Sequence, residues 1–130
     1  IVGGAAIVVT GVVGLGGAIA YGPSWALPLF ATVQGAGFGL SWTFVLRRGA
    51  AIVGAEDSER VTSAVNTVQR FGYALGAAAI GIAANRAGLS ITMDQDTARL
   101  VTLATFGLTL VPAVAGLAAA IRFVRFPEPA

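Results

Sequence analysis

The first 46 residues of the chain contain no charged side chain, and this run ends only at Arg47 and Arg48. A run of about 18 or more apolar residues is long enough to cross the hydrocarbon core of a bilayer, about 30 Å thick, as a helix. Gly22 and Pro23 interrupt the run near its middle, where they favour a tight turn. The run therefore predicts two helices that cross a membrane down and back.

The composition of the whole chain agrees with a lipid environment. Of its 130 residues, 56% are hydrophobic and only 11% are charged, whereas a typical globular domain has about 25% charged residues. So few charges cannot cover a water-facing surface. The 18 glycines suit membrane helices, which pack closely through small side chains. We therefore predict an all-α, polytopic membrane protein.

Four apolar segments are predicted to form transmembrane helices within a single region: residues 1–21, 24–46, 60–85 and 99–123. Each is about 20–26 residues long, which is enough to span a bilayer at about 1.5 Å per residue with some tilt. Asp57-Ser58 is expected to cap the third helix at its N-terminus. Asp96-Thr97 is expected to do the same for the fourth. Pro112 should kink the fourth helix, because proline removes a backbone hydrogen bond.

The distribution of arginine predicts the orientation of the helices. One side of the membrane collects five arginines: Arg47, Arg48, Arg60, Arg122 and Arg125. The other side has Arg86 and Arg99, diluted by two aspartates. Cytoplasmic loops of membrane proteins carry an excess of positive residues. We therefore expect the arginine-rich side, with the C-terminus, to be cytoplasmic, in a bacterial inner membrane.

The residue types present exclude most catalytic chemistry. The chain has no histidine and no cysteine, which removes the usual catalytic triads, thiolate chemistry and the commonest metal ligands. The six acidic residues lie in loops and in the tail, outside the apolar segments. The arginines are spread along the chain instead of forming one basic face, which argues against a nucleic-acid partner. We predict a protein that is not an enzyme, without catalytic residues, metal or cofactor.

The second predicted helix contains candidates for a substrate cavity. Gln34 lies near its midpoint, where a polar side chain must find partners and should face the bundle interior. It would serve either as a link between helices or as part of a cavity wall. Trp42 would either stack on a substrate or belong, with Trp25, to the two aromatic belts at the membrane surfaces, about 25 Å apart along the helix.

Two pairs of glycines are predicted to mediate helix packing. Gly35 and Gly39, and likewise Gly72 and Gly76, are spaced by four residues, so each pair lies on one helical face. Small residues at this spacing let two backbones approach closely in a membrane. The alternative is that they make these helices flexible for gating.

The third predicted helix carries the polar residues Asn66, Gln69, Arg70 and Tyr73. Asn66, Arg70 and Tyr73 follow the spacing of a single helical face. Arg70 is the only charge well within an apolar segment, and arginine at the bilayer centre costs about 2.5–3.5 kcal/mol. Its side chain therefore either reaches back to the membrane surface or faces protein or an aqueous cavity.

Part of the chain resembles a known transporter family. Residues 34–40 read QGAGFGL, residues 58–72 read SERVTSAVNTVQRFG, and Ala74-Leu75-Gly76 follows. This pattern is similar to the C-terminal part of major facilitator superfamily transporters, most of all the multidrug:proton antiporters with fourteen spans. The spacing from arginine to glycine is one residue shorter here than in that family. The chain also lacks a membrane-embedded acidic residue, so a titrating carboxylate would lie elsewhere in a longer protein.

The resemblance implies a fold and a function. Family members have two six-helix bundles around a central cavity and work by alternating access. The four helices would then form part of the C-terminal bundle. The candidates for the substrate cavity would be Gln34, Phe38 and Trp42. The candidates for the gate and for contacts between helices would be Asn66, Gln69, Arg70 and Tyr73.

The function expected from the resemblance is secondary active transport, specifically efflux of small molecules or drugs by an antiporter. The expected partners are the lipid bilayer, the remaining helices of a parent transporter and a small-molecule substrate. The chain begins at Ile1 instead of methionine, which fits a piece of a longer protein. The alternative is a complete small four-helix integral membrane protein with a scaffold or holin-like role. The sequence upstream of Ile1 would distinguish the two.

Overall fold

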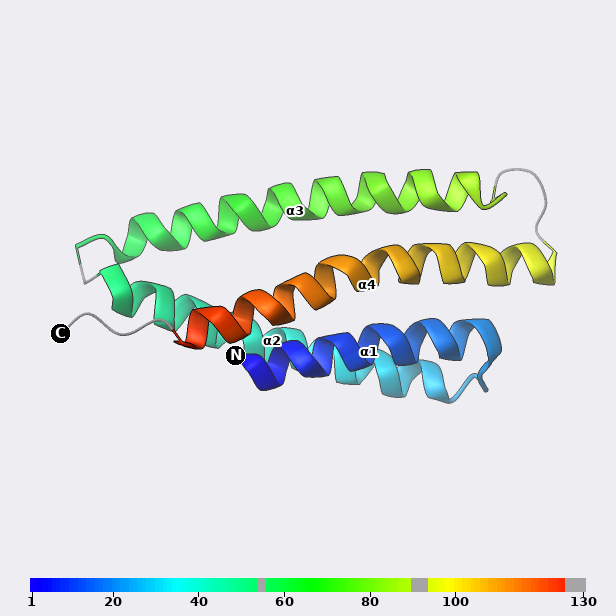
Figure 1. Ribbon diagram of the computed structural model, residues 1–130, viewed down its shortest axis with the longest axis horizontal. Helices are drawn as coiled ribbons and strands as arrows, with labels where there is room; N and C mark the ends of the chain where they lie inside the picture. Colours follow the sequence, from blue (N-terminus) through cyan, green and yellow to red (C-terminus); the bar gives the residue numbers. More distant parts are fainter. Residues whose placement is uncertain (54–55, 90–93, 126–130) are drawn as a thin grey trace.

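The computed structural model describes residues 1–53, 56–89 and 94–125, and these residues form four α-helices. The helices are α1 (Val2–Tyr21), α2 (Ala26–Val53), α3 (Ser58–Arg86) and α4 (Gln95–Arg125). They run up and down along one long axis, as Figure 1 shows. The prediction of an all-α chain is confirmed. Two boundaries differ from the prediction, because α2 continues beyond Arg48 and α4 begins at Gln95.

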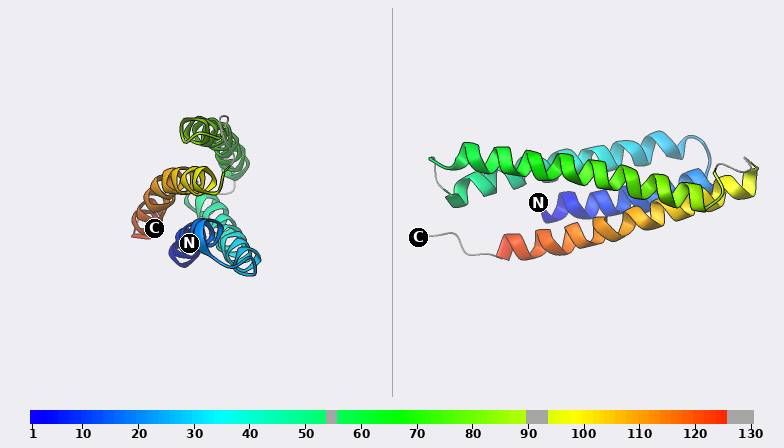
Figure 2. Two further views of the ribbon diagram at one scale, coloured as in Figure 1. Left: turned by 90° about the vertical axis from the view of Figure 1, so that its right-hand side faces the viewer. Right: turned by 90° about the horizontal axis from the view of Figure 1, so that it is seen from above.

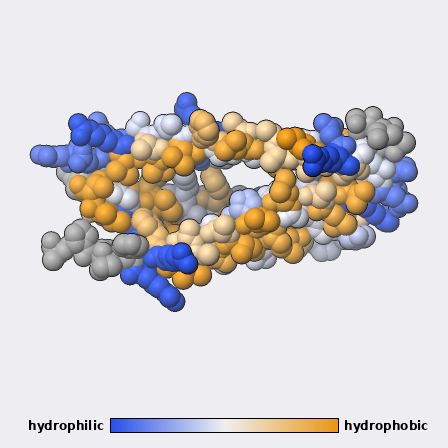
Figure 3. Space-filling model, turned by 45° about the horizontal axis from the view of Figure 1, so that its top comes forward, coloured by the Kyte–Doolittle hydropathy of each residue, from blue (hydrophilic) through white to orange (hydrophobic). Residues whose placement is uncertain are grey.

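The four helices do not form a symmetrical bundle. Among the described residues, α1 packs most extensively against α2 and then against α4. The third helix, α3, makes smaller contacts with α2 and α4, and it lies apart from the other helices in Figures 1 and 2. The space-filling view in Figure 3 shows openings between the helices. The compact part of the structure is therefore the group α1, α2 and α4.

Glycines bring α1 and α2 together. A Cβ atom built on Gly4 would lie 2.9 Å from the carbonyl oxygen of Gly37, and one built on Gly37 would lie 2.8 Å from the amide nitrogen of Val8. On the same interface, a Cβ atom on Gly11 would lie 2.7 Å from the Cα of Gln34. Real Cβ atoms do not approach other atoms this closely. The two backbones can pack at this distance only because glycine stands at these positions.

The interior of the structure is small. Val12 is the only large side chain that is fully buried among the described residues. Many apolar side chains point outward, for example Val68, which is 72% exposed, and Val111, which is 68% exposed. The orange surface in Figure 3 shows such apolar residues along the middle of the molecule, with blue hydrophilic residues at both ends. An apolar surface of this extent requires lipid or further helices to cover it.

Three of the helices are long and apolar enough to cross a membrane: α1, α2 and α4. The helix α3 has 29 residues and is also long enough at about 1.5 Å per residue, but its polar residues exclude it from this set. A crossing by α3 therefore stays a prediction. The helix α4 continues through Pro112, and its axis changes direction along its length in Figure 1, as expected of a proline inside a helix.

Candidate functional site

Two of the predicted cavity residues stack on each other on α2. The rings of Phe38 and Trp42 have centroids 6.1 Å apart and an interplanar angle of 9°. Trp42 also lines a groove of about 360 Å³ together with four residues of α3: Ala64, Val65, Val68 and Gln69. The walls of this groove are almost entirely apolar. The structure thus brings Trp42 to Gln69, which the sequence assigned to two different sites.

Gln34, the third predicted cavity residue, lies between α1 and α2. It is half-buried, and its Cα and Cβ atoms press against the backbone at Gly11. This position favours the first of its two predicted roles, a contact between helices. Gln34 lines neither the groove beside Trp42 nor the polar groove of α3 described next.

A polar groove of about 530 Å³ runs along one face of the N-terminal half of α3. Its lining residues are Ser58, Glu59, Thr62, Ser63, Asn66, Thr67 and Arg70. The hydroxyl groups of Thr62 and Thr67 donate hydrogen bonds to the backbone carbonyl oxygens four residues earlier, each at 2.9 Å. Asn66 and Arg70 have no such local partner. Their side chains are exposed and make no hydrogen bond or ion pair to any residue that the structure describes.

The other two predicted residues of α3 pair with each other. The side-chain amide of Gln69 donates a hydrogen bond to the hydroxyl oxygen of Tyr73 at 2.7 Å. The predicted face of Asn66, Arg70 and Tyr73 is therefore divided: Asn66 and Arg70 line the polar groove, and Tyr73 pairs with Gln69. The two grooves lie on different sides of α3, because Val68, which faces Trp42, is two residues from Asn66 and from Arg70.

The glycine pairs that the sequence singled out are not at the helix contacts of this structure. A Cβ atom built on Gly35, Gly39, Gly72 or Gly76 would meet nothing within 4 Å among the described residues. The close contacts fall on other glycines, including Gly37, which lies between the first pair. A packing role for the two pairs remains a prediction that concerns helices outside this chain.

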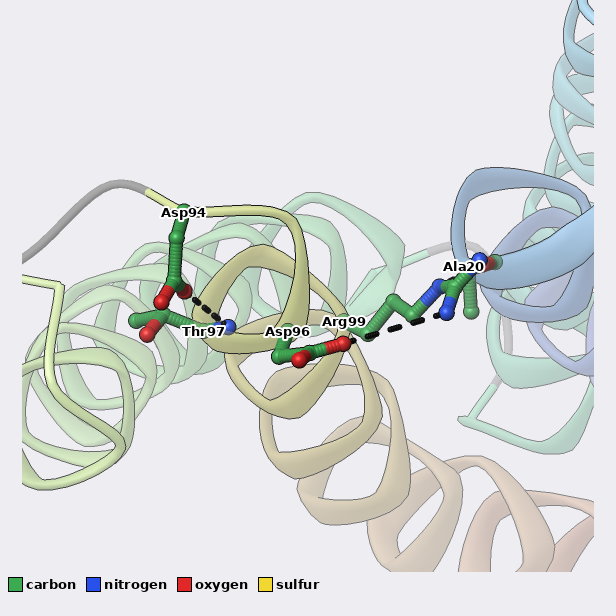
Figure 4. Close-up of polar contacts among 5 residues, drawn as sticks. All are labelled: Ala20, Asp94, Asp96, Thr97 and Arg99. Carbon is green, nitrogen blue, oxygen red and sulfur yellow. Dashed lines mark hydrogen bonds and ion pairs between the residues drawn. The ribbon is translucent and has the colours of Figure 1, made fainter.

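Arg99, which the sequence analysis used only to predict orientation, joins α4 to the end of α1. The Nε atom of Arg99 donates a hydrogen bond to the carbonyl oxygen of Ala20 at 3.2 Å, and the guanidinium group lies 5.5 Å from the centroid of the Tyr21 ring. Asp96, one turn earlier on α4, holds the guanidinium group from the other side at 3.9 Å (Figure 4). The last carbonyl groups of a helix lack partners within the helix. Arg99 supplies one from a neighbouring helix.

Arg48 makes an equivalent contact at the opposite end of the molecule. Its guanidinium group donates a hydrogen bond to the carbonyl oxygen of Val124 at 3.3 Å and lies 5.6 Å from the centroid of the Phe123 ring. Positive charge near a helix C-terminus is favourable because of the helix dipole. Each of the two arginines therefore stabilises the C-terminus of a neighbouring helix, Arg99 that of α1 and Arg48 that of α4.

Asp94 is the N-cap residue of α4, which begins at Gln95. The predicted cap at Asp96-Thr97 is therefore wrong by two residues. The backbone nitrogen of Thr97 donates a hydrogen bond to the carboxylate of Asp94 at 2.7 Å (Figure 4). This is the contact of an N-cap residue with the third residue of its helix. Hydrogen bonds from the side chain and the backbone of Thr97 lower the pKa of Asp94. The cap is therefore complete at neutral pH and weakens only as the pH falls through this lowered pKa.

Replacing Arg99 with alanine is expected to loosen α4 from α1. The change removes a charged hydrogen bond and a contact with an aromatic ring, which together correspond to about 1–2 kcal/mol of stability. The matched control is Arg86→Ala, because Arg86 is exposed and makes no contact of this kind within the described parts of the chain. Thermal unfolding in detergent should show a lower midpoint for Arg99→Ala than for Arg86→Ala. Equal midpoints would show that the contact between Arg99 and the end of α1 contributes nothing to stability.

The described residues contain no group of three or more acidic, histidine or cysteine side chains that could hold a metal ion. What the arrangement offers instead is a polar groove with an unpaired guanidinium group on α3, and an apolar groove beside Trp42. Comparisons of the chain with models of protein families, with curated proteins and with solved structures found no match.

Proposed function

We propose that the chain forms part of a secondary active transporter of the major facilitator type, which exports small molecules by alternating access. The observation that carries this proposal is the polar groove on α3. Its residues Asn66 and Arg70 lie on a helix that packs against two apolar helices, α2 and α4. A polar face of this kind is costly against hydrocarbon. It is therefore expected to face an aqueous pathway.

The apolar groove beside Trp42 supports the same proposal. Small-molecule sites in proteins are mainly apolar, with a few polar groups that fix the orientation of the ligand. The groove combines Trp42 with apolar side chains of α3, and Gln69, whose amide bonds to Tyr73, lies at its wall. In the proposed transporter, α3 crosses the membrane with one face on the pathway, and the other helices of the parent protein cover the exposed surfaces of α2 and α3.

The alternative is a small four-helix membrane protein that acts as a scaffold or in the manner of a holin. One observation favours it: α1 already packs against both α2 and α4 within this chain. Such a protein has no need of a substrate groove.

Transport by the polypeptide that contains this chain tests the proposal. The purified protein would be reconstituted into liposomes, and the movement of a fluorescent lipophilic drug would be followed after an ion gradient is imposed. The proposal expects uptake that depends on the gradient and stops when an ionophore collapses it. Drug movement that is equal with and without the protein would contradict transport. Release of the liposome contents without a gradient would favour the holin-like alternative.

A further inference from the structure

A second apolar groove lies at the end of the molecule where α2 and α4 finish. It has a volume of about 490 Å³. Its walls include Ile1 at the start of α1, Val45 on α2 and five residues of α4: Gly116, Ala119, Ala120, Arg122 and Phe123. In the described structure α2 and α4 do not pack backbone to backbone. Arg48 is the residue that reaches from one helix to the other. The groove is thus a gap beside the start of α1, between the apolar helices α2 and α4, which Arg48 bridges at one end.

Positive charge collects at this end of the gap. Arg122 lines the groove itself, and Arg47 lines a smaller groove of about 290 Å³, together with Ile1, Phe44, Arg48 and Ala51. Ile1 is common to the two grooves. Arg47 and Arg122 form no ion pair and no hydrogen bond with the residues that the structure covers. No acidic side chain within residues 1–53, 56–89 and 94–125 lines either groove. Among the acidic residues that the structure describes, the nearest along the chain lie around Asp57 at the start of α3, and Asp57 itself pairs with Arg60 at 3.0 Å.

The combination of an apolar gap and unpaired arginines indicates the kind of molecule that fits. Both α2 and α4 are apolar enough to cross a membrane, so the gap between them opens toward lipid chains, and its charged end lies where a helix meets the headgroups. Basic pockets between transmembrane helices on the cytoplasmic side suit anionic headgroups. A soluble anion would use the arginines but would gain nothing from the apolar walls.

We propose that this groove binds an anionic phospholipid, with one acyl chain between α2 and α4 and the headgroup phosphate on Arg122. Arg47 adds positive charge beside the phosphate. Arg48 is already in contact with Val124 and Phe123. This contact keeps α2 and α4 at the separation that the acyl chain requires. The site depends on insertion into a membrane but not on transport, so it stands or falls independently of the transporter proposal.

Lipid binding to the full chain in detergent tests the site. Phosphatidylglycerol and phosphatidylcholine with identical acyl chains would be titrated, and bound lipid counted by native mass spectrometry. We expect tighter binding of phosphatidylglycerol. Each of Arg122→Ala and Arg47→Ala should weaken it about fivefold, as expected for one basic residue near an anionic headgroup. Arg86→Ala removes the same charge at the other end of the molecule and should leave binding unchanged.

A second set of variants tests the acyl-chain part of the groove. A Cβ atom on Gly116 would meet nothing within 4 Å among the described residues, so Gly116→Leu fills the groove without displacing the backbone. It should weaken binding of phosphatidylglycerol, whereas Gly81→Leu on α3, where a Cβ atom is equally unobstructed, should not. Circular dichroism of each variant verifies that the helices are retained, and Ala119→Leu provides a second filling variant.

Several results would overturn the proposal. Equal binding of the two lipids, or unchanged binding of phosphatidylglycerol in Arg122→Ala, would contradict the proposed contact between Arg122 and the headgroup. Unchanged binding of phosphatidylglycerol in both Gly116→Leu and Ala119→Leu would show that the acyl chain does not lie in this groove. Displacement of the lipid by glycerol 3-phosphate at equal concentration would show a site for soluble phosphate in place of a lipid site.

Discussion

Replacing Gly11 with leucine is expected to separate α1 from α2 and to destabilise the chain by about 3 kcal/mol, the upper range for overpacking a tight contact. A Cβ atom at this position would lie 2.6 Å from the Cβ of Gln34 and 2.9 Å from its backbone nitrogen. The obstacle is largely backbone, which cannot rotate out of the way as a flexible side chain can. The measurement is thermal unfolding in detergent, followed by circular dichroism.

The same substitution at Gly35 is the matched control. Gly35 is next to Gln34 in the sequence, and a Cβ atom there would meet nothing within 4 Å in the described part of the chain. Gly35→Leu should therefore unfold at nearly the same temperature as the unmodified chain. If Gly35→Leu lowers the unfolding temperature of the isolated chain more than Gly11→Leu does, then α2 turns a different face toward α1 than the one described.

Replacing Arg70 with alanine is expected to reduce transport by about tenfold to a hundredfold in the polypeptide that contains this chain, the loss expected for one charged hydrogen bond. The reason is that Arg70 is the only charge well within the apolar segment predicted at residues 60–85 and has no partner among the described residues. Its hydrogen-bond donors are thus free to bind a substrate in the proposed transporter. Initial rates of drug uptake in liposomes provide the measurement.

Two controls separate this effect from a loss of folding. Arg86→Ala removes an exposed arginine of the same helix and should transport normally. Gln34→Ala, at the contact between α1 and α2, should lower stability more than it lowers the transport rate per folded molecule. Normal transport by Arg70→Ala would contradict the assignment of Arg70 to the gate.

The helices could be predicted from the sequence because solvation alone determines them. The charge-free run before Arg47 becomes α1 and most of α2. The end of α2 was predicted too early, since Arg47 and Arg48 were interpreted as the membrane surface, whereas the small apolar residues after them continue the helix to Val53. The start of α4 was predicted too late because the actual cap is Asp94.

The contacts between helices could not be predicted in the same way. A helix that is apolar on all sides carries no periodic pattern that tells which face packs inward. The glycine cluster of α2 illustrates this: Gly35 and Gly39 were predicted to pack, but Gly37 is the one that meets α1. Arg99 and Ala20 are 79 residues apart in the sequence. No local signal connects them, so this contact became visible only in three dimensions.

The sequence predicted which residues belong to the candidate site, but not which of them lie together in the structure. Asn66 and Arg70 share a groove, as their spacing indicates, because both lie on one face of a regular helix. The meeting of Trp42 with Gln69 depends on how α2 and α3 are placed relative to each other. That placement follows from the loop between them and from packing, which the sequence pattern does not specify.

The central claim is that α2 and α3 each cross the membrane, and labelling of single cysteines tests it most directly. The chain has no cysteine, so Ser24→Cys, Ser58→Cys and Gln95→Cys can each be labelled without background. In right-side-out vesicles, a membrane-impermeant maleimide should label positions 24 and 95 from outside, and position 58 only after the membrane is opened. Labelling of all three positions from the same side would contradict the account.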